Sequence, residues 1–259
     1  MQAGSELEKF IEVDGNYDRI YVIGDIHGCL PETETLLSHL EKKEKVSRTD
    51  LIVFIGDYID RGENSKEVID LLIEFRKNNR EAYFLRGNHE DMLLHYLGCE
   101  EVSGVGADYL ANGGAATLKS YGYTSRKKPE NVANEMPKSH LSFLLNLDRY
   151  IIHPQYVFVH AGLNPLRDLR AQLDKDIFWI RDEFISNVHY FDRIVLFGHT
   201  PYEEVMFHIP YKIGIDTGLV YGNKLTCIEL NEQRLIQVEA GSSKVKTRKF
   251  KLESPLKTE

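Results

Sequence analysis

Short apolar runs, rich in β-branched and aromatic residues, alternate with amphipathic segments in the first part of the chain. The apolar runs lie at residues 20–23, 51–55 and 82–85, and the amphipathic segments begin near Pro31 and Ser65. Apolar side chains recur with helical period in those segments, and a proline is well suited to the first turn of a helix. The alternation predicts strand–loop–helix units and hence a layered α/β fold.

The pattern changes in the middle of the chain. Residues 91–150 carry few strand signals, and we expect them to form a mainly helical insertion over the cleft. Strand signals then dominate, and a hairpin turn is predicted at residues 221–224. The strand candidates of this half are residues 156–159, 193–197, 212–215, 225–230 and 234–238. We expect one domain over residues 1–259, with a polar, basic tail at 241–259 that either frays or adds an edge strand.

Composition narrows the class of protein. A chain of 259 residues with a net charge of −8 can bury a sizeable core and is poorly suited to wrapping nucleic acid, so stable nucleic-acid binding is not expected. The cysteines Cys29, Cys99 and Cys227 form neither a disulfide framework nor a CxxC pair. The first residues lack the features of a signal peptide, and no apolar run is long enough to span a membrane. We expect a cytoplasmic protein without a membrane partner, and the sequence indicates no oligomeric state.

Five of the apolar runs are followed by short loops made of residue types that bind metals or phosphate. The loops are Gly24-Asp25-Ile26-His27-Gly28, Gly56-Asp57-Tyr58-Ile59-Asp60-Arg61-Gly62, Gly87-Asn88-His89-Glu90, His160-Ala161-Gly162 and Gly198-His199-Thr200. Strand ends converge in α/β proteins, so residues that are far apart in sequence can share one cleft. We therefore expect these loops to form one site.

The side chains in these loops suit a site for two divalent metals. Asp25 and His27 are two residues apart, so in an extended loop both project the same way and can reach one ion. Asp57 has two carboxylate oxygens and can bridge two ions. The second ion would be completed by Asn88, His160 and His199. Any one of these loops alone is more often a turn or a core residue, but the five together favour the metal site.

The set of loops resembles that of the calcineurin-like metallophosphoesterases, and within them the phosphoprotein phosphatase branch with its bacterial and phage-type serine/threonine phosphatases. That branch shows GDxHG, GDxxDRG, GNHE, H-A/G-G and GH motifs in this order, and residues 20–230 contain all of them without a substitution at a ligand position. The resemblance implies two packed mixed β-sheets flanked by helices, a four-layer α/β/β/α fold. It assigns one ion to Asp25, His27 and Asp57, and the other to Asp57, Asn88, His160 and His199.

The same resemblance implies roles around the metals. His89 would be the general acid, and Asp60 would orient its ring and raise its pKa. The phosphoryl oxygens would be bound by Arg61, Asn88 and Arg181, the last of which follows Trp179-Ile180. A hydroxide that bridges the two metals would attack phosphorus in line. No Cys-x₅-Arg motif suggests a covalent phosphoenzyme.

Three neighbouring positions stay open between a structural and a functional role. Arg86 either supports the fold or faces the substrate, and Glu90 caps or pairs. Thr117, which follows Asn112-Gly113-Gly114, either walls the cleft or belongs to a plain turn.

The motifs allow more than one function. The leading interpretation is hydrolysis of phosphoserine and phosphothreonine monoesters in proteins, because Leu85-Arg86 before the GNHE motif resembles the protein phosphatases. The alternative is a dinucleoside tetraphosphate hydrolase, or a pyrophosphohydrolase of nucleotides or RNA ends. The minor alternative is an inactive binding scaffold. Of the metals that suit these ligands, Mn²⁺ is expected, with Fe or Zn as alternatives.

Overall fold

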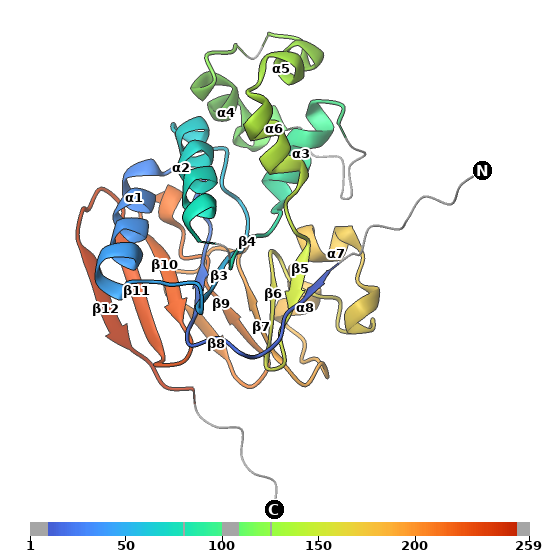
Figure 1. Ribbon diagram of the computed structural model, residues 1–259. Helices are drawn as coiled ribbons and strands as arrows, with labels where there is room; N and C mark the ends of the chain where they lie inside the picture. Colours follow the sequence, from blue (N-terminus) through green and yellow to red (C-terminus); the bar gives the residue numbers. More distant parts are fainter. Residues whose placement is uncertain (1–9, 80, 100–108, 125, 253–259) are drawn as a thin grey trace, which may run out of the picture.

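Two six-stranded mixed β-sheets pack face to face in the computed structural model, which describes residues 10–79, 81–99, 109–124 and 126–252 (Figure 1). The first sheet has the order β12-β11-β10-β2-β3-β4, in which β2, β3 and β4 are parallel and the other neighbours are antiparallel. Its strands are β2 (Ile20–Ile23), β3 (Leu51–Phe54), β4 (Ala82–Phe84), β10 (Lys224–Glu229), β11 (Arg234–Glu239) and β12 (Val245–Lys249).

The second sheet has the order β1-β5-β6-β7-β9-β8. Its central strands β6, β7 and β9 are parallel, and β5 and β8 are antiparallel to their inner neighbours. Its strands are β1 (Ile11–Glu12), β5 (Tyr150–Ile152), β6 (Tyr156–Val159), β7 (Ile194–Phe197), β8 (Met206–His208) and β9 (Lys212–Gly214).

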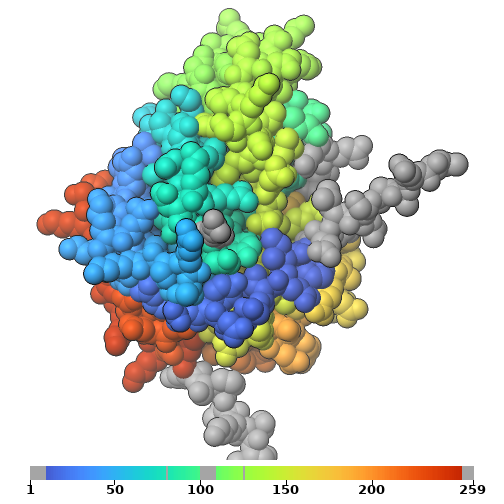
Figure 2. Space-filling view, viewed as in Figure 1, coloured from blue at the N-terminus to red at the C-terminus, as the bar shows by residue number. Residues whose placement is uncertain are grey.

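Helices cover the outer face of each sheet. The first sheet is covered by α1 (Leu30–His39), which continues into η1 (Leu40–Glu44), and by α2 (Ser65–Asn78). The second is covered by α7 (Asp174–Trp179) and α8 (Asp182–Ile185), which follow the short turn η3 (Leu169–Ala171). The remaining helices are α3 (Asn88–Tyr96), η2 (Leu110–Gly114), α4 (Ala115–Ser120), α5 (Pro129–Glu135) and α6 (Lys138–Leu145). The green to yellow-green helices α4, α5 and α6 form the upper end of the face shown in Figure 2.

Alternate residues of one strand enter different cores. In β2, Tyr21 and Ile23 pack beneath α1 and α2, whereas Val22 faces the second sheet. In β6, Phe158 meets the first sheet and Val159 packs beneath α7 and α8. Central strands that are buried on both faces must be apolar throughout, which explains the unbroken apolar runs in the sequence.

This architecture brings the carboxyl ends of both sets of parallel strands to one rim. A hydrogen bond of 3.0 Å from the backbone amide of His199 to Asp25 Oδ2 joins the loops after β7 and β2. Another, of 2.8 Å, runs from Gly198 to the carbonyl of His160 and joins the loops after β7 and β6. The loops that carry the motifs therefore meet, although they come from two different sheets.

The predicted fold class is confirmed, and every predicted strand is present with small shifts at its ends. The strands that the sequence did not predict are β1, β5 and β8. The predicted helical insertion, residues 91–150, is helical in its described part only up to Leu145, and β5 begins at its last residue. The tail contains the edge strand β12, which confirms the expectation of an added edge strand for this part of the chain. Residues 1–9, 80, 100–108, 125 and 253–259 lie outside the described part, and the single-domain assignment stays a prediction.

The predicted hairpin turn at residues 221–224 is wrong. Residues Leu219–Tyr221 form a short 3₁₀ turn, η4, and the hairpin instead joins β10 to β11. Gly218 and Gly222 flank this turn in left-handed conformations, with φ of 65° and 89°, which bend the chain before β10 begins. Within the described part of the chain, no helix is both long and apolar enough to cross a bilayer, and the cytoplasmic location stays a prediction.

Candidate active site

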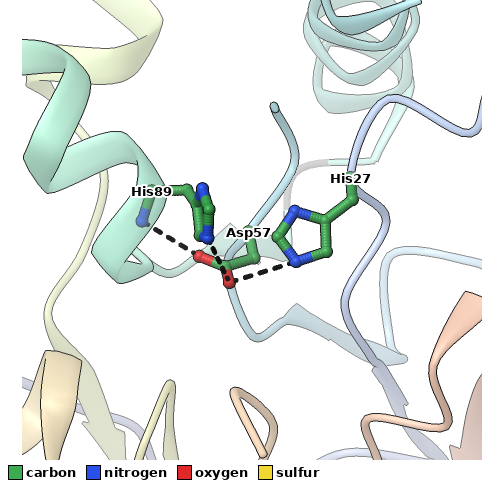
Figure 3. A group of neighbouring side chains, drawn as sticks. All are labelled: His27, Asp57 and His89. Atoms are coloured by element: carbon green, nitrogen blue, oxygen red, sulfur yellow. Dashed lines mark hydrogen bonds and ion pairs between the residues drawn. The ribbon is translucent and has the colours of Figure 1, made fainter. Parts of the chain in front are cut away.

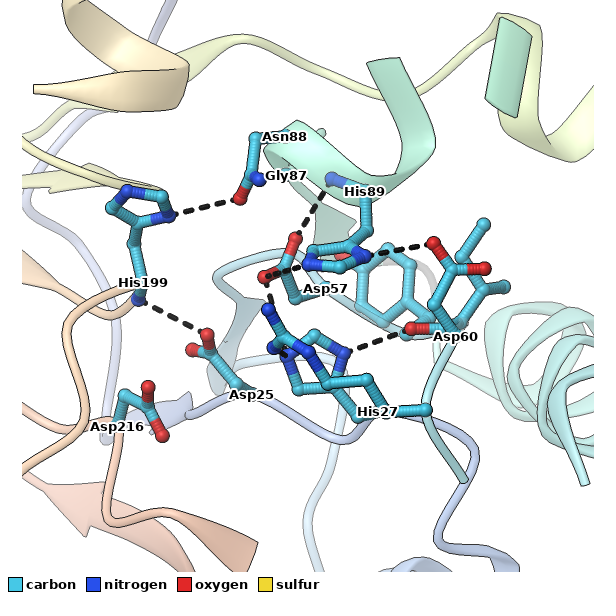
Figure 4. Close-up of polar contacts among 12 residues, drawn as sticks. Asp25, His27, Asp57, Asp60, Gly87, Asn88, His89, His199 and Asp216 are labelled. Atoms are coloured by element: carbon cyan, nitrogen blue, oxygen red, sulfur yellow. Dashed lines mark hydrogen bonds and ion pairs between the residues drawn. The ribbon is translucent and has the colours of Figure 1, made fainter. Parts of the chain in front are cut away.

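The expected site residues come together at the rim, each at the end of a strand (Figure 4). Asp25 and His27 follow β2, and Asp57, Asp60 and Arg61 follow β3. The first turn of α3, directly after β4, carries Asn88 and His89, while His160 follows β6 and His199 follows β7. These residues are buried except for Arg61, which is exposed and can reach a ligand from the surface.

Several site residues have a backbone conformation that non-glycine residues seldom adopt. The left-handed positions, with φ in parentheses, are His27 (47°), Asp57 (55°), Asp60 (71°), Arg61 (67°) and His199 (63°). Such residues are uncommon and persist where surrounding contacts enforce them. Their concentration here means that the loops are shaped for the site at some cost to stability.

The carboxylate of Glu90 supplies one of those enforcing contacts. Its Oε2 accepts hydrogen bonds from the backbone amides of Gly87 at 2.9 Å and Asp57 at 3.0 Å, and its Oε1 accepts one from Tyr58 at 2.8 Å. Glu90 is fully buried, so no water competes for these amides. The side chain fastens the loop after β3 to the start of α3. This answers the open question about Glu90, because its carboxylate caps the first turn of α3 at Gly87 and also holds the amides of Asp57 and Tyr58.

Two glycines are required by close approach. A Cβ on Gly87 would lie 2.1 Å from Asp57 Oδ1, and a Cβ on Gly198 would lie 2.1 Å from Asp25 Oδ1. Both distances are far below contact distance, so only glycine lets the carboxylates take these positions.

A first group of potential ligands consists of His27, Asp57 and His89 (Figure 3). His27 Nε2 lies 3.4 Å from Asp57 Oδ2, and His89 Nε2 lies 4.0 Å from the same oxygen. His27 Nδ1 donates to the carbonyl of Ile59 at 2.9 Å, which leaves the lone pair of its Nε2 facing the carboxylate. The guanidinium of Arg61 contacts that same Nε2.

A second group consists of Asp57, His160 and His199, with Asn88 between the two imidazoles. Asn88 Oδ1 lies 3.0 Å from His160 Nε2 and 2.9 Å from His199 Nδ1. His160 Nε2 is also 3.4 Å from Asp57 Oδ1. Because His160 Nδ1 donates to the carbonyl of Ile55 at 2.8 Å, the Nε2 of a neutral His160 carries a lone pair that points at oxygen acceptors.

This donor set fits divalent cations. Asp25 Oδ1 and His199 Nε2 are buried polar atoms without a hydrogen-bond partner, and a bound cation would satisfy such atoms. Burial lowers the pKa of His27 to about 3 and lowers the pKa of His160 and of His199, so all three imidazoles are neutral, as metal ligands must be. Burial opposes ionisation of Asp57, but the positive charge that the surrounding imidazoles, His160 foremost, carry when protonated lowers its pKa.

His89 forms a buried pair with Asp60. His89 Nδ1 lies 2.7 Å from Asp60 Oδ2, while Asp60 Oδ1 accepts hydrogen bonds from Tyr109 at 2.9 Å and Thr117 at 2.6 Å. Burial works against a charged His89, but Asp57 and the hydrogen bond to Asp60 raise its pKa overall. Gly113, in η2 just before the helix α4 that carries Thr117, accepts a hydrogen bond of 3.2 Å from the Arg61 amide. Residues 113–117 therefore line the site, which is one of the two roles expected for Thr117.

The second expected arginine approaches from the other sheet. Arg181 is exposed, and its guanidinium donates to Thr200 Oγ1 at 3.3 Å, next to His199. Trp179 contributes a ring 6.4 Å from that of His199, measured between centroids. Arg86, in contrast, is only 5% exposed and donates to the carbonyl of Leu145, which favours a structural role.

A buried lysine holds the segment that carries Arg181. Lys212 in β9 is fully buried, and its ammonium group donates to the carbonyls of Phe184, Ile185 and Asn187, just beyond Arg181. Its Nζ also lies 4.2 Å from the centroid of the Phe184 ring. Burial lowers the pKa of Lys212 to about 8. The sequence placed Lys212 on a predicted strand and gave no indication that its ammonium group would hold the segment after Arg181.

Asp216 is a site residue that sequence reasoning missed. It follows β9 as the other residues follow their strands, is 5% exposed, and accepts a hydrogen bond of 2.9 Å from the Gly218 amide. Burial raises its pKa to about 6, and the charges of Asp216 and Asp57 add to burial in raising the pKa of Asp25. Its position directly after an apolar run was the signal that could have identified it.

Comparison with known proteins identifies the family of the chain. A model of the family described as calcineurin-like phosphoesterase matches residues 18–234. The asymmetrical bis(5'-nucleosyl)-tetraphosphatase PrpE of Oceanobacillus iheyensis is 29% identical over 240 residues, which cover 85% of this chain and 92% of the relative. The Bacillus cereus protein of the same name is 26% identical over 243 residues, with coverage of 84% and 92%.

Solved structures support the fold. One described as a candidate diadenosine tetraphosphatase has a TM-score of 0.66 and 22% identity, covering 90% of this chain and 99% of its own. A protein serine/threonine phosphatase of Saccharomyces cerevisiae has a TM-score of 0.54 and 17% identity, with coverage of 96% and 85%. Both likenesses concern the arrangement of the two sheets.

Replacement of Glu90 by Gln is expected to weaken metal binding. The substitution keeps size but turns one acceptor into a donor that faces backbone amides, so the loop that presents Asp57 loses its anchor. Loss of a group that orients a ligand typically costs 10–100-fold in metal affinity, or about 1.4–2.8 kcal/mol. Titration with Mn²⁺ followed by metal analysis measures the effect, with the surface substitution Glu74→Gln as control. Wild-type affinity in Glu90→Gln would contradict the anchoring role.

Lys212 is expected to give the stability a specific pH dependence. Its pKa is about 8 in the folded chain against 10.5 for an exposed lysine, so the unfolded chain binds more protons between these values. The free energy of unfolding of the wild type, relative to Lys212→Met, should be constant below pH 8 and rise from about pH 8 to 10.5. Urea unfolding at a series of pH values tests this, with the exposed Lys77→Met as control. A flat or falling difference would refute it.

Proposed function

The chain belongs to the calcineurin-like phosphoesterase family and is a metal-dependent phosphoesterase, and we propose that its substrate is a dinucleoside tetraphosphate that it cleaves asymmetrically. The supporting observation is that relatives named for this activity match the chain over 92% of their own length. The protein phosphatases share the fold at 17% identity. The order of the two interpretations expected from the motifs is therefore reversed, and phosphoprotein hydrolysis becomes the second candidate.

The geometry groups Asp57 with His27 on one side and with His160 and His199 on the other, while Asp25 enters the first set on the motif alone. We assign Asp25, His27 and Asp57 to one cation and Asp57, Asn88, His160 and His199 to the other. Asp57 is the natural bridging group, since its Oδ2 faces His27 and its Oδ1 faces His160. Bound divalent cations supply Lewis-acid polarisation of a phosphoryl oxygen and a water nucleophile at neutral pH. The convergence of all these ligands argues against the inactive scaffold. Mn²⁺ stays a prediction.

His89 is assigned to proton donation, although its Nε2 also faces Asp57. Its Nδ1 is engaged by Asp60, which is itself fixed by Tyr109 and Thr117, so the ring has one orientation and its protonated form is favoured. A proton on His89 Nε2 can pass to the oxygen of the departing group.

Arg61 and Arg181 are assigned to the phosphate chain of the substrate. They approach from opposite sheets and are both exposed, so their forked guanidinium groups can bind phosphoryl oxygens on either side of the ligand cluster. Asn88 faces the same space through its amide group. A chain of four phosphates offers anionic oxygens to both arginines at once, whereas a single phosphomonoester offers fewer.

The substrate preference is tested with Mn²⁺-loaded protein. We expect kcat/KM for diadenosine tetraphosphate to exceed that for a phosphothreonine peptide by at least tenfold, or about 1.4 kcal/mol in transition-state stabilisation. Chromatography should show one nucleoside monophosphate and one nucleoside triphosphate as products. Dialysis against EDTA should abolish the activity, and Mn²⁺ should restore it. Preference for the peptide would transfer the function to the second candidate.

Replacement of His89 by Asn is expected to show a leaving-group dependence. General acid catalysis is worth about 10²–10⁴-fold, and the largest loss falls on alkyl phosphates, whose departing oxygen needs a proton. p-Nitrophenyl phosphate should be affected much less, because its leaving group departs without one. Comparison of kcat for the two ester types measures the effect, with His95→Asn, an exposed position on the same helix, as control. Equal losses for both esters, or a loss of bound metal, would contradict the assignment.

A further inference from the structure

An exposed tyrosine stands beside the phosphate-binding arginine. Tyr221 is 63% exposed, and the guanidinium carbon of Arg61 lies 5.6 Å from the centroid of its ring. Arg61 itself is anchored through its amide to Gly113 and contacts His27, one of the proposed ligands. The ring of Tyr221 therefore borders the place where the phosphate chain of a substrate would lie.

The backbone beneath Tyr221 is fixed. It lies in η4, which begins after Gly218 in a left-handed conformation, and the Gly218 amide donates to Asp216 Oδ1 at 2.9 Å. The Tyr221 amide donates to the carbonyl of Gly218 at 3.0 Å, and Asn223 Nδ2 donates to the carbonyl of Glu203 at 2.9 Å. The turn is tied to the end of β9 and to the loop after β7, so the ring is presented on a rigid support.

A large aromatic ring that is left in water on a rigid support suits a stacking partner. One side of the ring is near Arg61, and most of the remaining surface is accessible. A ligand that places phosphate at Arg61 and a planar aromatic group a short distance away would use both residues together. Nucleotides have this arrangement.

We propose that Tyr221 is a specificity-determining residue, the platform on which one nucleobase of the substrate stacks. This inference rests on the proposed nucleotide substrate and extends it, because it assigns recognition of the base to a residue outside the ligand cluster. A phosphothreonine peptide offers no planar ring at a fixed distance from its phosphate. The tyrosine hydroxyl is not required, so any aromatic residue at position 221 should serve.

The experiment compares inhibitors that differ only in the base. AMP and ribose 5-phosphate are used as competitive inhibitors of the Mn²⁺-loaded full chain acting on diadenosine tetraphosphate, and the ratio of their inhibition constants isolates the base. In the wild type AMP should bind more tightly, by roughly tenfold or more. In Tyr221→Ala this ratio should approach one, with ribose 5-phosphate unaffected. Tyr221→Phe and Tyr221→Trp should retain the wild-type ratio.

Tyr190→Ala is the matched control. Tyr190 is 85% exposed and precedes β7, whereas the site lies after the carboxyl end of that strand, so its removal should leave the ratio unchanged. Thermal unfolding verifies that each variant is folded.

The outcomes separate the two levels of inference. A wild type that cleaves the tetraphosphate while Tyr221→Ala retains the full ratio overturns the stacking role and leaves the proposed function intact. If the wild type cleaves only the phosphothreonine peptide, the proposed function is wrong. Inhibition of peptide cleavage by AMP and ribose 5-phosphate is then measured, and equal inhibition by the two compounds overturns the stacking role as well.

Discussion

The geometry of the rim depends on one buried carboxylate. Glu90 accepts the amides of Gly87, Asp57 and Tyr58, which have no access to water and would otherwise stay unsatisfied inside the protein. By holding these amides it keeps Asp57 in its left-handed conformation, and Asp57 is the group that His27, His89 and His160 all face. A single buried acceptor, outside the residues assigned to the cations, thus sets the relative positions of loops from two strands.

The conformation of the site lowers the stability of the folded chain. Left-handed non-glycine residues cost of the order of 1–3 kcal/mol each, and several of them occur together with buried imidazoles and carboxylates whose hydrogen bonds are incomplete. A typical domain has only about 5–15 kcal/mol of net stability, so such a site requires a large core to support it. The two sheets, with apolar clusters between them and beneath both helical layers, supply that core. Cation binding would add to it, because it stabilises only the folded form.

The sequence predicted what is local and left out what is formed across the fold. Strands buried on both faces were visible as apolar runs, and ligand residues directly after them were visible as motifs, so β2, β3, β6 and β7 and their loops were predicted correctly. Capping by Glu90 was one of the roles expected. Its contacts with the amides of Asp57 and Tyr58, and the function of Lys212, were not predicted, because these partners are backbone groups that only the folded chain brings near. β5 was missed because pairing with β6 determines so short a strand. The turn at Tyr221 was predicted wrongly for the same reason, because hydrogen bonds to Asp216 and to the carbonyl of Glu203 determine the conformation of that segment.

The inner and outer parts of the site obey different constraints, and this explains why shared motifs did not identify the substrate. The inner residues come from strand ends, are buried, and are positioned by the packing of the two sheets, so the residues assigned as ligands follow from the core and not from the substrate. The outer residues Arg61, Arg181 and Tyr221 are exposed and sit on turns whose positions depend on separate supports, Gly113, Lys212 and Asp216 respectively. A change in one support can move an outer residue without disturbing the ligands. Of these outer residues, Arg181 and Tyr221 lie outside the motifs, so we expect substrate class to depend on the contacts that hold their turns in place.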